Sequence, residues 1–163
     1  MRDNFFEGKR ILVTGGTGFI GSEIVRQLIK YNPEVIRILS NDEFMQFKME
    51  QEFRQSEDTN IRYLLGDIRD PNRVRRAIEG IDYVFHAAAL KHVKSCEYDP
   101  LEAIQTNVIG TQNVVISALE EKSVKKVILI STDKAVNPIS TMGATKLLAE
   151  KLMTWATFYK RVS

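Results

Sequence analysis

The segment RILVTGGTGFIG, residues 10–21, decides the fold. Its apolar run ends directly in glycines, and the residues after Gly21 repeat apolar side chains at helical spacing. A strand, a glycine turn and a helix in this order are typical of a dinucleotide-binding unit, because amides at the helix N-terminus bind a pyrophosphate. We expect Gly15 to permit the tight turn, Gly18 to let the backbone approach the phosphates, and Gly21 to let helix and strand pack closely.

Further apolar runs alternate with helical patterns along the rest of the chain. They predict strands at residues 35–40, 61–65, 82–86 and 126–131. Strands that alternate with helices form a parallel sheet wound by right-handed crossovers. We therefore predict an α/β fold, a Rossmann-like doubly wound parallel sheet of about five strands with helices on both faces. No linker or repeat divides the sequence, so residues 1–163 are expected to form one NAD(P)-binding domain.

The composition narrows the class of protein. The chain has 163 residues, 44% of them hydrophobic, with 23 basic and 21 acidic side chains. This balance creates no strong field toward nucleic acid or anionic lipid. No apolar stretch approaches the roughly 18 residues of a spanning helix, and we expect a cytoplasmic protein with no membrane insertion. The single cysteine, Cys96, cannot form an internal disulfide, and no metal site is predicted.

Local patterns predict where helices begin and which faces are buried. Asp70 and Asp99 each precede a proline, which is a signal for a helix start. Apolar residues at near-helical spacing are expected to face the sheet. They are Leu101, Ile104, Val108, Val115 and Leu119 after Asp99, and Phe44, Met45, Phe47, Met49 and Phe53 after the second strand.

Residues at the carboxyl ends of the expected strands are candidates for holding a dinucleotide, because ligands bind there in open sheets. Asp67 is expected to accept a hydrogen bond from the adenine amino group, and the small residues 87–89 to let the nicotinamide ribose approach. Asp42 lies about 20 residues past Gly21, which suits a free ribose diol and favours NAD slightly over NADP. The candidates are Gly15, Thr17, Gly18, Phe19, Ile20, Gly21, Ser40, Asn41, Asp42, Asp67, Ile68, Ala87, Ala88 and Ala89.

Four motifs in order resemble the extended short-chain dehydrogenase/reductase family. They are residues 14–21, residues 87–91, TNVIGT at 106–111 and MGATK at 142–146. Two longer segments, HAAALKHVKSCEYDPLEAIQTNVIGT at 86–111 and STDKAVNPISTMGATKLLAEKL at 131–152, are similar to the UDP-N-acetylglucosamine 4,6-dehydratases of polysaccharide biosynthesis. The resemblance covers the whole chain and the amino-terminal half of that family.

The resemblance implies a reaction and a set of roles. A nicotinamide cofactor takes hydride from sugar C4, water is lost across C5 and C6, and the hydride returns to C6. Asp133 is then the general acid at the C6 oxygen and Lys134 the base at C5, so Asp133 must hold its proton. Thr132 is expected to bind the C4 oxygen, and Lys146 the nicotinamide ribose and thus part of the cofactor. Substrate contacts are expected from Lys91, Ser131 and Thr132.

The sequence departs from the wider family at two places. Most members carry a tyrosine four residues before the active-site lysine, where this chain has Met142, as a subgroup of the dehydratases does. Methionine cannot exchange a proton, so the C4 proton is expected to pass to Thr132 with Asp133, Lys134 or a water. Asn41 and Met45 replace the arginine and lysine that hold a 2′-phosphate in soluble relatives. Lys48, Arg37 or backbone donors could still serve NADP.

The chain also stops soon after the helix that holds Lys146, whereas family members continue into a smaller lobe that grips the nucleotide-sugar. We expect this lobe to be absent from the 163 residues, although a UDP-sugar is the expected partner and a homo-oligomer the expected assembly. Two alternatives stay open. One is a nucleotide-sugar 4-epimerase, and the other is a non-catalytic dinucleotide-binding or dimerisation module.

Overall fold

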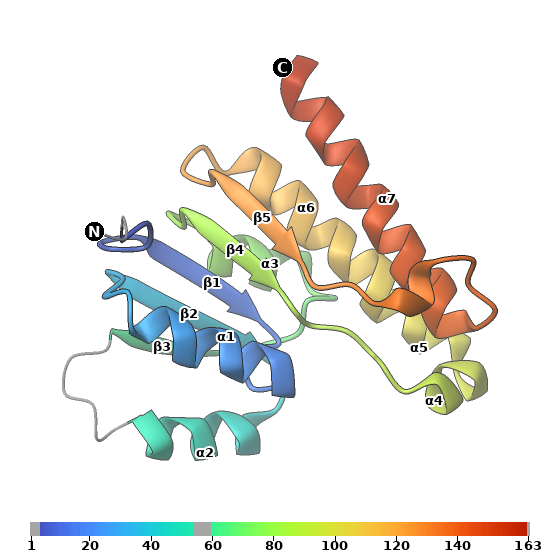
Figure 1. Ribbon diagram of the computed structural model, residues 1–163, viewed down its shortest axis with the longest axis horizontal. Coiled ribbons are helices and arrows are strands. Elements are labelled where there is room, and N and C mark those ends of the chain that lie inside the picture. Colours follow the sequence, from blue (N-terminus) through green and yellow to red (C-terminus); the bar gives the residue numbers. More distant parts are fainter. Residues whose placement is uncertain (1–3, 54–59, 163) are drawn as a thin grey trace.

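A computed structural model describes residues 4–53 and 60–162. In these residues five parallel strands form one sheet in the order β3-β2-β1-β4-β5 (Figure 1). The strands are β1 (Arg10–Thr14), β2 (Val35–Ser40), β3 (Ile61–Leu65), β4 (Tyr83–His86) and β5 (Lys126–Leu129). The order reverses between β1 and β4, which places a topological switch point there. The predicted Rossmann-like sheet is confirmed, although β4 begins and β5 ends inside the predicted bounds.

Helices cover both faces of this sheet (Figure 1). One face carries α1 (Phe19–Ile29) and α2 (Glu43–Phe53), and the other carries α3 (Pro71–Ile78) and α6 (Gly110–Glu120). Beyond the carboxyl ends of the strands lie α4 (Val93–Tyr98), α5 (Pro100–Ile104), the π-helical turn η1 (Gln105–Ile109) and the 3-10 turn η2 (Asp133–Ala135). The long α7 (Thr141–Val162) begins there and runs back alongside α6 (Figure 1). None of the helices in the described part of the chain is long and apolar enough to cross a membrane.

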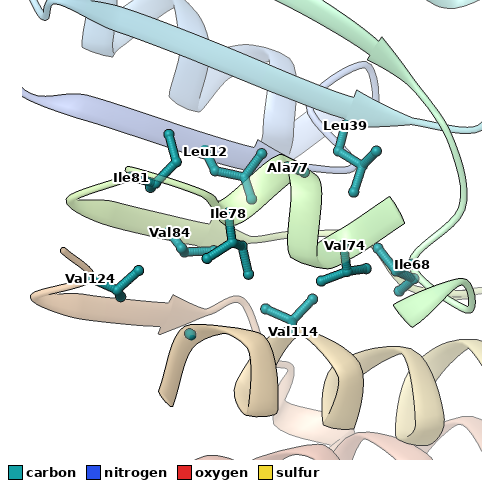
Figure 2. Close-up of a cluster of buried hydrophobic side chains, with 11 residues drawn as sticks. Leu12, Leu39, Ile68, Val74, Ala77, Ile78, Ile81, Val84, Val114 and Val124 are labelled. Atoms are coloured by element: carbon teal, nitrogen blue, oxygen red, sulfur yellow. The ribbon is translucent and has the colours of Figure 1, made fainter. Parts of the chain in front are cut away.

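Alternate side chains of β1 serve two separate cores, because successive residues of a strand point to opposite faces. Leu12 packs with Val74 of α3 and Val114 of α6 in the core that Figure 2 shows. Its neighbours Ile11 and Val13 pack with α1 and α2 on the other face. Both cores are fully buried at the centre of the sheet, so close packing on both faces fixes the position of the carboxyl ends of the strands.

Both predicted helix starts are present. The Asp70 side chain accepts hydrogen bonds from the backbone nitrogens of Asn72 and Arg73, and the Asp99 side chain accepts one from that of Glu102. In each case a proline occupies the first helical position. The backbone N–H that proline lacks would have no intrahelical partner at this position.

The prediction that Leu101 and Ile104 face the sheet is wrong, since 71% and 40% of their surfaces are exposed. The turn η1 separates α5 from α6, and a π-helical turn inserts an extra residue that rotates the face on one side against the other. Consequently α5 packs through Ala103 against Cys96 and Met142, away from the sheet.

Three residues of the apolar stripe expected on α2 are also exposed: Phe44, Met45 and Phe47. The helix instead buries Met49 and the polar Gln46. The Gln46 side-chain amide donates to the carbonyl oxygens of Ser40 at 3.1 Å and Leu64 at 2.9 Å. These carbonyls lie near the carboxyl ends of β2 and β3. The Gln46 amide therefore faces the sheet, where the sequence pattern predicted aromatic rings.

Candidate functional site

A cleft of about 310 Å³ lies at the carboxyl ends of β1, β2, β3 and β4. Apart from Lys146, all the residues predicted to hold a dinucleotide line it, and so does Lys91. The lining also includes four residues that the sequence analysis did not select: Leu39, Gly66, Leu90 and Thr106. The structure therefore brings the predicted cofactor residues together at the switch point of the sheet.

The glycine turn at one end of the cleft leaves no room for a side chain at Gly15 or Gly21. Gly15 has φ +64, and a Cβ atom there would lie 2.7 Å from the backbone nitrogen of Ala88. A Cβ atom on Gly21 would overlap the Gly15 carbonyl. Gly18 differs, because its φ is −73 and an added Cβ would meet only the Gly15 oxygen, at 3.3 Å. Gly15 and Gly21 are thus required by packing, whereas the open side of Gly18 is the side of an incoming group.

The N-terminus of α1 is prepared for an anion. Gly18 is its N-cap and provides no side-chain hydrogen bond, and no acidic residue lies in the first turn. The amides of an uncapped N-terminus carry partial positive charge. These amides border the cleft through Phe19, Ile20 and Gly21. This helix N-terminus is therefore suited to binding an anion such as a phosphate group.

The opposite end of the cleft is polar and internally linked. Thr17 Oγ1 lies 2.7 Å from Ser40 Oγ, and Asn41 Nδ2 donates to Asp67 Oδ2 at 3.3 Å. Partial burial alone would raise the pKa of Asp67, but hydrogen bonds from Arg69 and Asn41 hold that pKa below its ordinary value. Asp67 is therefore an ionised hydrogen-bond acceptor at this end of the cleft.

Asp42 has a structural role that its position in the sequence did not reveal. Its Oδ1 accepts a hydrogen bond from the backbone nitrogen of Met45 at 2.9 Å, in the first turn of α2. This bond fixes the carboxylate at the rim of the cleft, which Asp42 lines.

The residues predicted for catalysis form a second group, at the end of β5 and on α7, and they do not line the cleft. The Thr132 hydroxyl donates to Asp133 Oδ1 at 3.0 Å and accepts from the backbone nitrogen of Lys134 at 3.3 Å. The Lys134 amine lies 3.8 Å from Asp133 Oδ1. The three side chains are thus neighbours at the surface, and 89% of the Asp133 side chain is exposed.

The expectation that Asp133 holds its proton is wrong for the chain in this state. The hydrogen bond from Thr132 and the charge of Lys134 both lower the pKa of Asp133. Exposure removes the burial that would raise a carboxyl pKa. A protonated Asp133 therefore requires a group that covers the pair, as a bound sugar would.

Lys146 is held against the chain that leaves β5. It is 7% exposed, and its amine donates to the carbonyl oxygen of Ile130 at 2.6 Å. Burial lowers the pKa of Lys146, and the nearby Glu150 opposes this only in part. Glu150 also accepts a hydrogen bond from the Ser131 hydroxyl. Lys146 and Glu150, one turn apart on α7, therefore hydrogen-bond Ile130 and Ser131, the two residues before Thr132.

A third contact from the same face of α7 comes from Gly143. A Cβ atom there would overlap the carbonyl oxygen of Lys134. Residues three and four apart share a helix face, so Gly143, Lys146 and Glu150 form one surface. This surface positions the segment from Ile130 to Lys134.

Met142 lies inside a packed cluster. It is 4% exposed and contacts Cys96 and Ala103, with Val93 beside them. Burial raises the pKa of the Cys96 thiol, which is the behaviour of a structural cysteine. The side chain at the tyrosine position of the wider family is therefore part of the packing between α4, α5 and α7.

The sequence analysis missed His86 and its partners Thr14 and Thr111. All three are at most 1% exposed, and both ring nitrogens of His86 contact a threonine hydroxyl. A histidine at the end of an otherwise apolar strand was the available signal. Asn107, part of the TNVIGT motif, was given no side-chain role, whereas its side chain forms three hydrogen bonds.

A doubly wound parallel sheet, with a glycine turn and a cleft at the switch point, defines the class of nucleotide-binding α/β proteins. Residues 11–162 match the family described as "Polysaccharide biosynthesis protein". The chain belongs to this family.

Relatives at high identity have three different descriptions. An uncharacterized membrane protein of Methanocaldococcus jannaschii is 57% identical over 96% of this chain and 46% of its own length. A UDP-N-acetylglucosamine 4,6-dehydratase (inverting) of Campylobacter jejuni is 48% identical over 93% of this chain and 44% of its own. A UDP-glucose 4-epimerase of Rickettsia typhi is 45% identical over 90% and 43%. The chain spans less than half the length of these relatives.

Solved structures agree with this placement. The X-ray structure of Pen from Bacillus thuringiensis matches with a TM-score of 0.93 and 50% identity, over 98% of this chain and 48% of that one. DesIV, a dTDP-glucose 4,6-dehydratase from Streptomyces venezuelae solved with NAD bound, matches with a TM-score of 0.79 and 28% identity, over 88% and 50%.

Proposed function

We propose that this chain is the NAD-binding part of a nucleotide-sugar 4,6-dehydratase that acts on UDP-N-acetylglucosamine. One observation carries the proposal: a cleft with a glycine turn lies at the switch point of the sheet, and the surface of α7 that contains Lys146 holds the segment with Thr132, Asp133 and Lys134 at the end of β5. The names of the Campylobacter relative and of DesIV support the reaction, and the NAD bound to DesIV supports the cofactor.

In this proposal the glycine turn and the N-terminus of α1 hold the pyrophosphate. Asp67 accepts from the adenine amino group, Asp42 binds a ribose diol, and Lys146 binds the nicotinamide ribose. The bound nicotinamide supplies the capacity to accept a hydride from sugar C4 and to return it to C6. Asp42 lines the cleft, and Asn41 and Met45 lie near it in the sequence. Because a carboxylate suits a free ribose diol better than a 2′-phosphate, this arrangement favours NAD over NADP.

The second group of residues moves the protons. Thr132 hydrogen-bonds the C4 oxygen, and the C4 hydroxyl proton passes through Thr132 to Asp133, Lys134 or a water as the hydride leaves C4. Lys134 removes the proton from C5 as the bond from C6 to its hydroxyl breaks, and Asp133 protonates that hydroxyl so that it leaves as water. Covering by the sugar raises the pKa of Asp133 from its lowered value in the open chain, because burial disfavours the carboxylate. Lys91, in the lining of the cleft, contacts the substrate.

Two other functions have specific support. The Rickettsia relative carries the name of a 4-epimerase, a reaction that needs no elimination. The Asp133–Lys134 pair argues against it, because an epimerase has no leaving hydroxyl for an acid and base to serve. A non-catalytic dinucleotide-binding module is the third candidate, since the chain matches less than half of each named enzyme.

Binding of the cofactor is tested by titrating the chain with NAD. Gly18→Ala places a methyl group on the open side of the cradle without a forbidden φ. We expect this variant to unfold like the wild type but to bind NAD at least about tenfold more weakly. Ser22→Ala, which alters α1 one turn away, is the control and should bind normally. A wild-type chain that binds no dinucleotide contradicts the proposal.

The reaction is tested by incubating the chain with NAD and UDP-N-acetylglucosamine and analysing the sugar by mass spectrometry and NMR. A 4-keto-6-deoxy product that disappears in Asp133→Asn and Lys134→Ala supports the dehydratase. An epimer at C4 supports the epimerase, and NAD binding with no product supports the module. Wild-type turnover in either variant contradicts the roles assigned to that residue.

A further inference from the structure

His86 connects three parts of the fold from a buried position. It ends β4, directly before residues 87–89, which line the cleft. Its Nδ1 lies 2.6 Å from the Thr14 hydroxyl, which ends β1 just before Gly15. Its Nε2 lies 3.0 Å from the Thr111 hydroxyl of α6. One imidazole therefore joins the glycine turn to the helix that follows η1.

The donor and the acceptor in each of these bonds follow from Thr111. Its hydroxyl donates its single proton to the carbonyl oxygen of Asn107 at 2.6 Å, so its oxygen accepts from an Nε2–H of His86. Burial, followed by the charge of Lys146, lowers the pKa of His86 to about 3, so the ring is neutral and carries no second proton. Nδ1 is then an acceptor, and the Thr14 hydroxyl donates to it.

Each end of this chain of hydrogen bonds reaches the cleft. The Thr14 oxygen accepts from the backbone nitrogen of Ala88 at 3.4 Å, and this nitrogen would lie 2.7 Å from a Cβ atom added at Gly15. At the other end, the Asn107 side chain accepts from the Leu90 nitrogen at 2.7 Å and donates to the Leu90 oxygen at 2.9 Å. Hydrogen bonds thus fix both ends of the segment 88–90, to Thr14 at Ala88 and to Asn107 at Leu90. His86 lies between these two sets of bonds in the network.

The Asn107 carbonyl has a local reason to need Thr111. Asn107 is buried in the middle of η1, where π-helical spacing displaces the ordinary backbone donor. A threonine hydroxyl four residues later supplies a donor. Asn107 Nδ2 also donates to the Thr145 hydroxyl at 3.0 Å, next to Lys146 on α7. The network therefore extends to the helix that carries Lys146.

We propose that His86, as a neutral imidazole protonated on Nε2, is a positioning residue that sets the spacing between the glycine turn and residues 88–90 for dinucleotide binding. The proposal rests on the NAD-binding function proposed above. His86 is 1% exposed and contacts no ligand in this role, so its effect passes through Thr14 and Thr111.

The protonation pattern is tested in the wild-type chain by ¹⁵N NMR of the imidazole rings. The sequence contains two histidines, so His92→Gln assigns both sets of signals. We expect His86 to show a protonated Nε2 and an unprotonated Nδ1 at pH 7, and to keep that pattern at pH 5. A proton on Nδ1, or a doubly protonated ring at either pH, overturns the proposal whether or not NAD binds.

The positioning role is tested by NAD affinity in two variants at one position. Thr111→Val removes the hydroxyl with little change of shape, and Thr111→Ser keeps the hydroxyl. We expect the valine variant to bind NAD about tenfold more weakly and the serine variant to bind within about threefold of the wild type. Ser117→Ala, at another buried position of α6, controls for the loss of a hydroxyl and should bind normally.

The outcomes separate the two proposals. If the wild type binds NAD and the valine variant binds equally well, the positioning role is overturned and the proposed function stands. Equal weakening in the valine and serine variants also overturns it, because the hydroxyl is then irrelevant. If the wild type binds no NAD, the proposed function fails and the positioning role fails with it, although the NMR pattern still stands as a description of His86.

Discussion

The side-chain amine of Lys146 lies 2.6 Å from the carbonyl oxygen of Ile130, which ties α7 to the chain that leaves β5. Lys146 is nearly buried, and Ile130 is two residues before Thr132. Before any ligand binds, the lysine therefore has a structural partner. An ammonium has three N–H donors, so Lys146 can keep this bond while it donates to a further acceptor.

The burial of Lys146 predicts a pH-dependent stability. Its pKa in the folded chain is lowered from the ordinary 10.5, so between these two values the unfolded chain binds more protons than the folded one. The contribution of Lys146 to the free energy of unfolding therefore rises with pH in this window, by at most about 1.4 kcal/mol per pH unit. Urea unfolding of the wild type and Lys146→Met from pH 7 to 10.5 measures the difference. A constant difference contradicts the lowered pKa.

Gly143→Ala tests the contact between α7 and η2. Alanine normally stabilises a helix relative to glycine by about 1 kcal/mol, but here the new methyl group meets the Lys134 carbonyl. We expect turnover to fall at least about tenfold as Thr132, Asp133 and Lys134 shift, with NAD affinity unchanged. Turnover is measured with saturating NAD, and affinity by titration. A variant that is more stable and fully active shows that the close approach has no functional role.

Much of the fold and of the cleft was predictable because the signals are local. A glycine turn between a strand and a helix requires a backbone geometry that Gly15 and Gly21 supply, and alternating strands and helices leave few topologies. The capping residues Asp70 and Asp99 act on the next three residues of the chain. Such features depend on neighbours in sequence and could be found without coordinates.

The features that were missed depend on residues far apart in sequence. Leu101 is exposed because η1 changes the phase of the helix, and that turn is stabilised by Thr111 and by contacts to Leu90. The buried amide of Gln46 satisfies carbonyls on two strands, which no periodicity reveals. The lowered pKa of Asp133, by contrast, follows from the hydrogen bond of Thr132 and the charge of Lys134, its two neighbours in sequence.

The rim of the cleft predicts how cofactor preference can be changed. Asn41 donates to Asp67, and the neighbouring Asp42 carboxylate caps α2. A 2′-phosphate beside Asp42 would therefore face a negative charge. We expect the wild type to prefer NAD. Asn41→Arg supplies a fork that can bind a phosphate, and it should shift the ratio of the NAD and NADP dissociation constants at least about tenfold toward NADP.

Asn41→Gln is the control for this substitution, since it lengthens the side chain without adding charge. Its ratio of dissociation constants should stay near that of the wild type. A wild-type chain that already binds NADP more tightly contradicts the assignment of Asp42 to the ribose diol. In that case Lys48 or Arg37 is the next residue to substitute.

Gly15 and Gly8 provide a matched pair for separating backbone strain from steric overlap. Their φ angles are +64 and +63, so alanine meets the same left-handed conformation at both positions. A Cβ atom at Gly8 has nothing within 4 Å, whereas one at Gly15 lies 2.7 Å from the Ala88 backbone. Gly8→Ala should therefore lower the free energy of unfolding by about 1–2 kcal/mol, the strain alone. Gly15→Ala should lower it by roughly 1–3 kcal/mol more, because β1 and β4 must separate at the switch point.

Urea unfolding measures both changes, and titration of the folded variants with NAD should show a loss of affinity only for Gly15→Ala. Equal destabilisation by the two substitutions would mean that β1 and β4 separate at Gly15 without a cost in free energy. The backbone at this end of the cleft would then be too deformable to select a dinucleotide by shape.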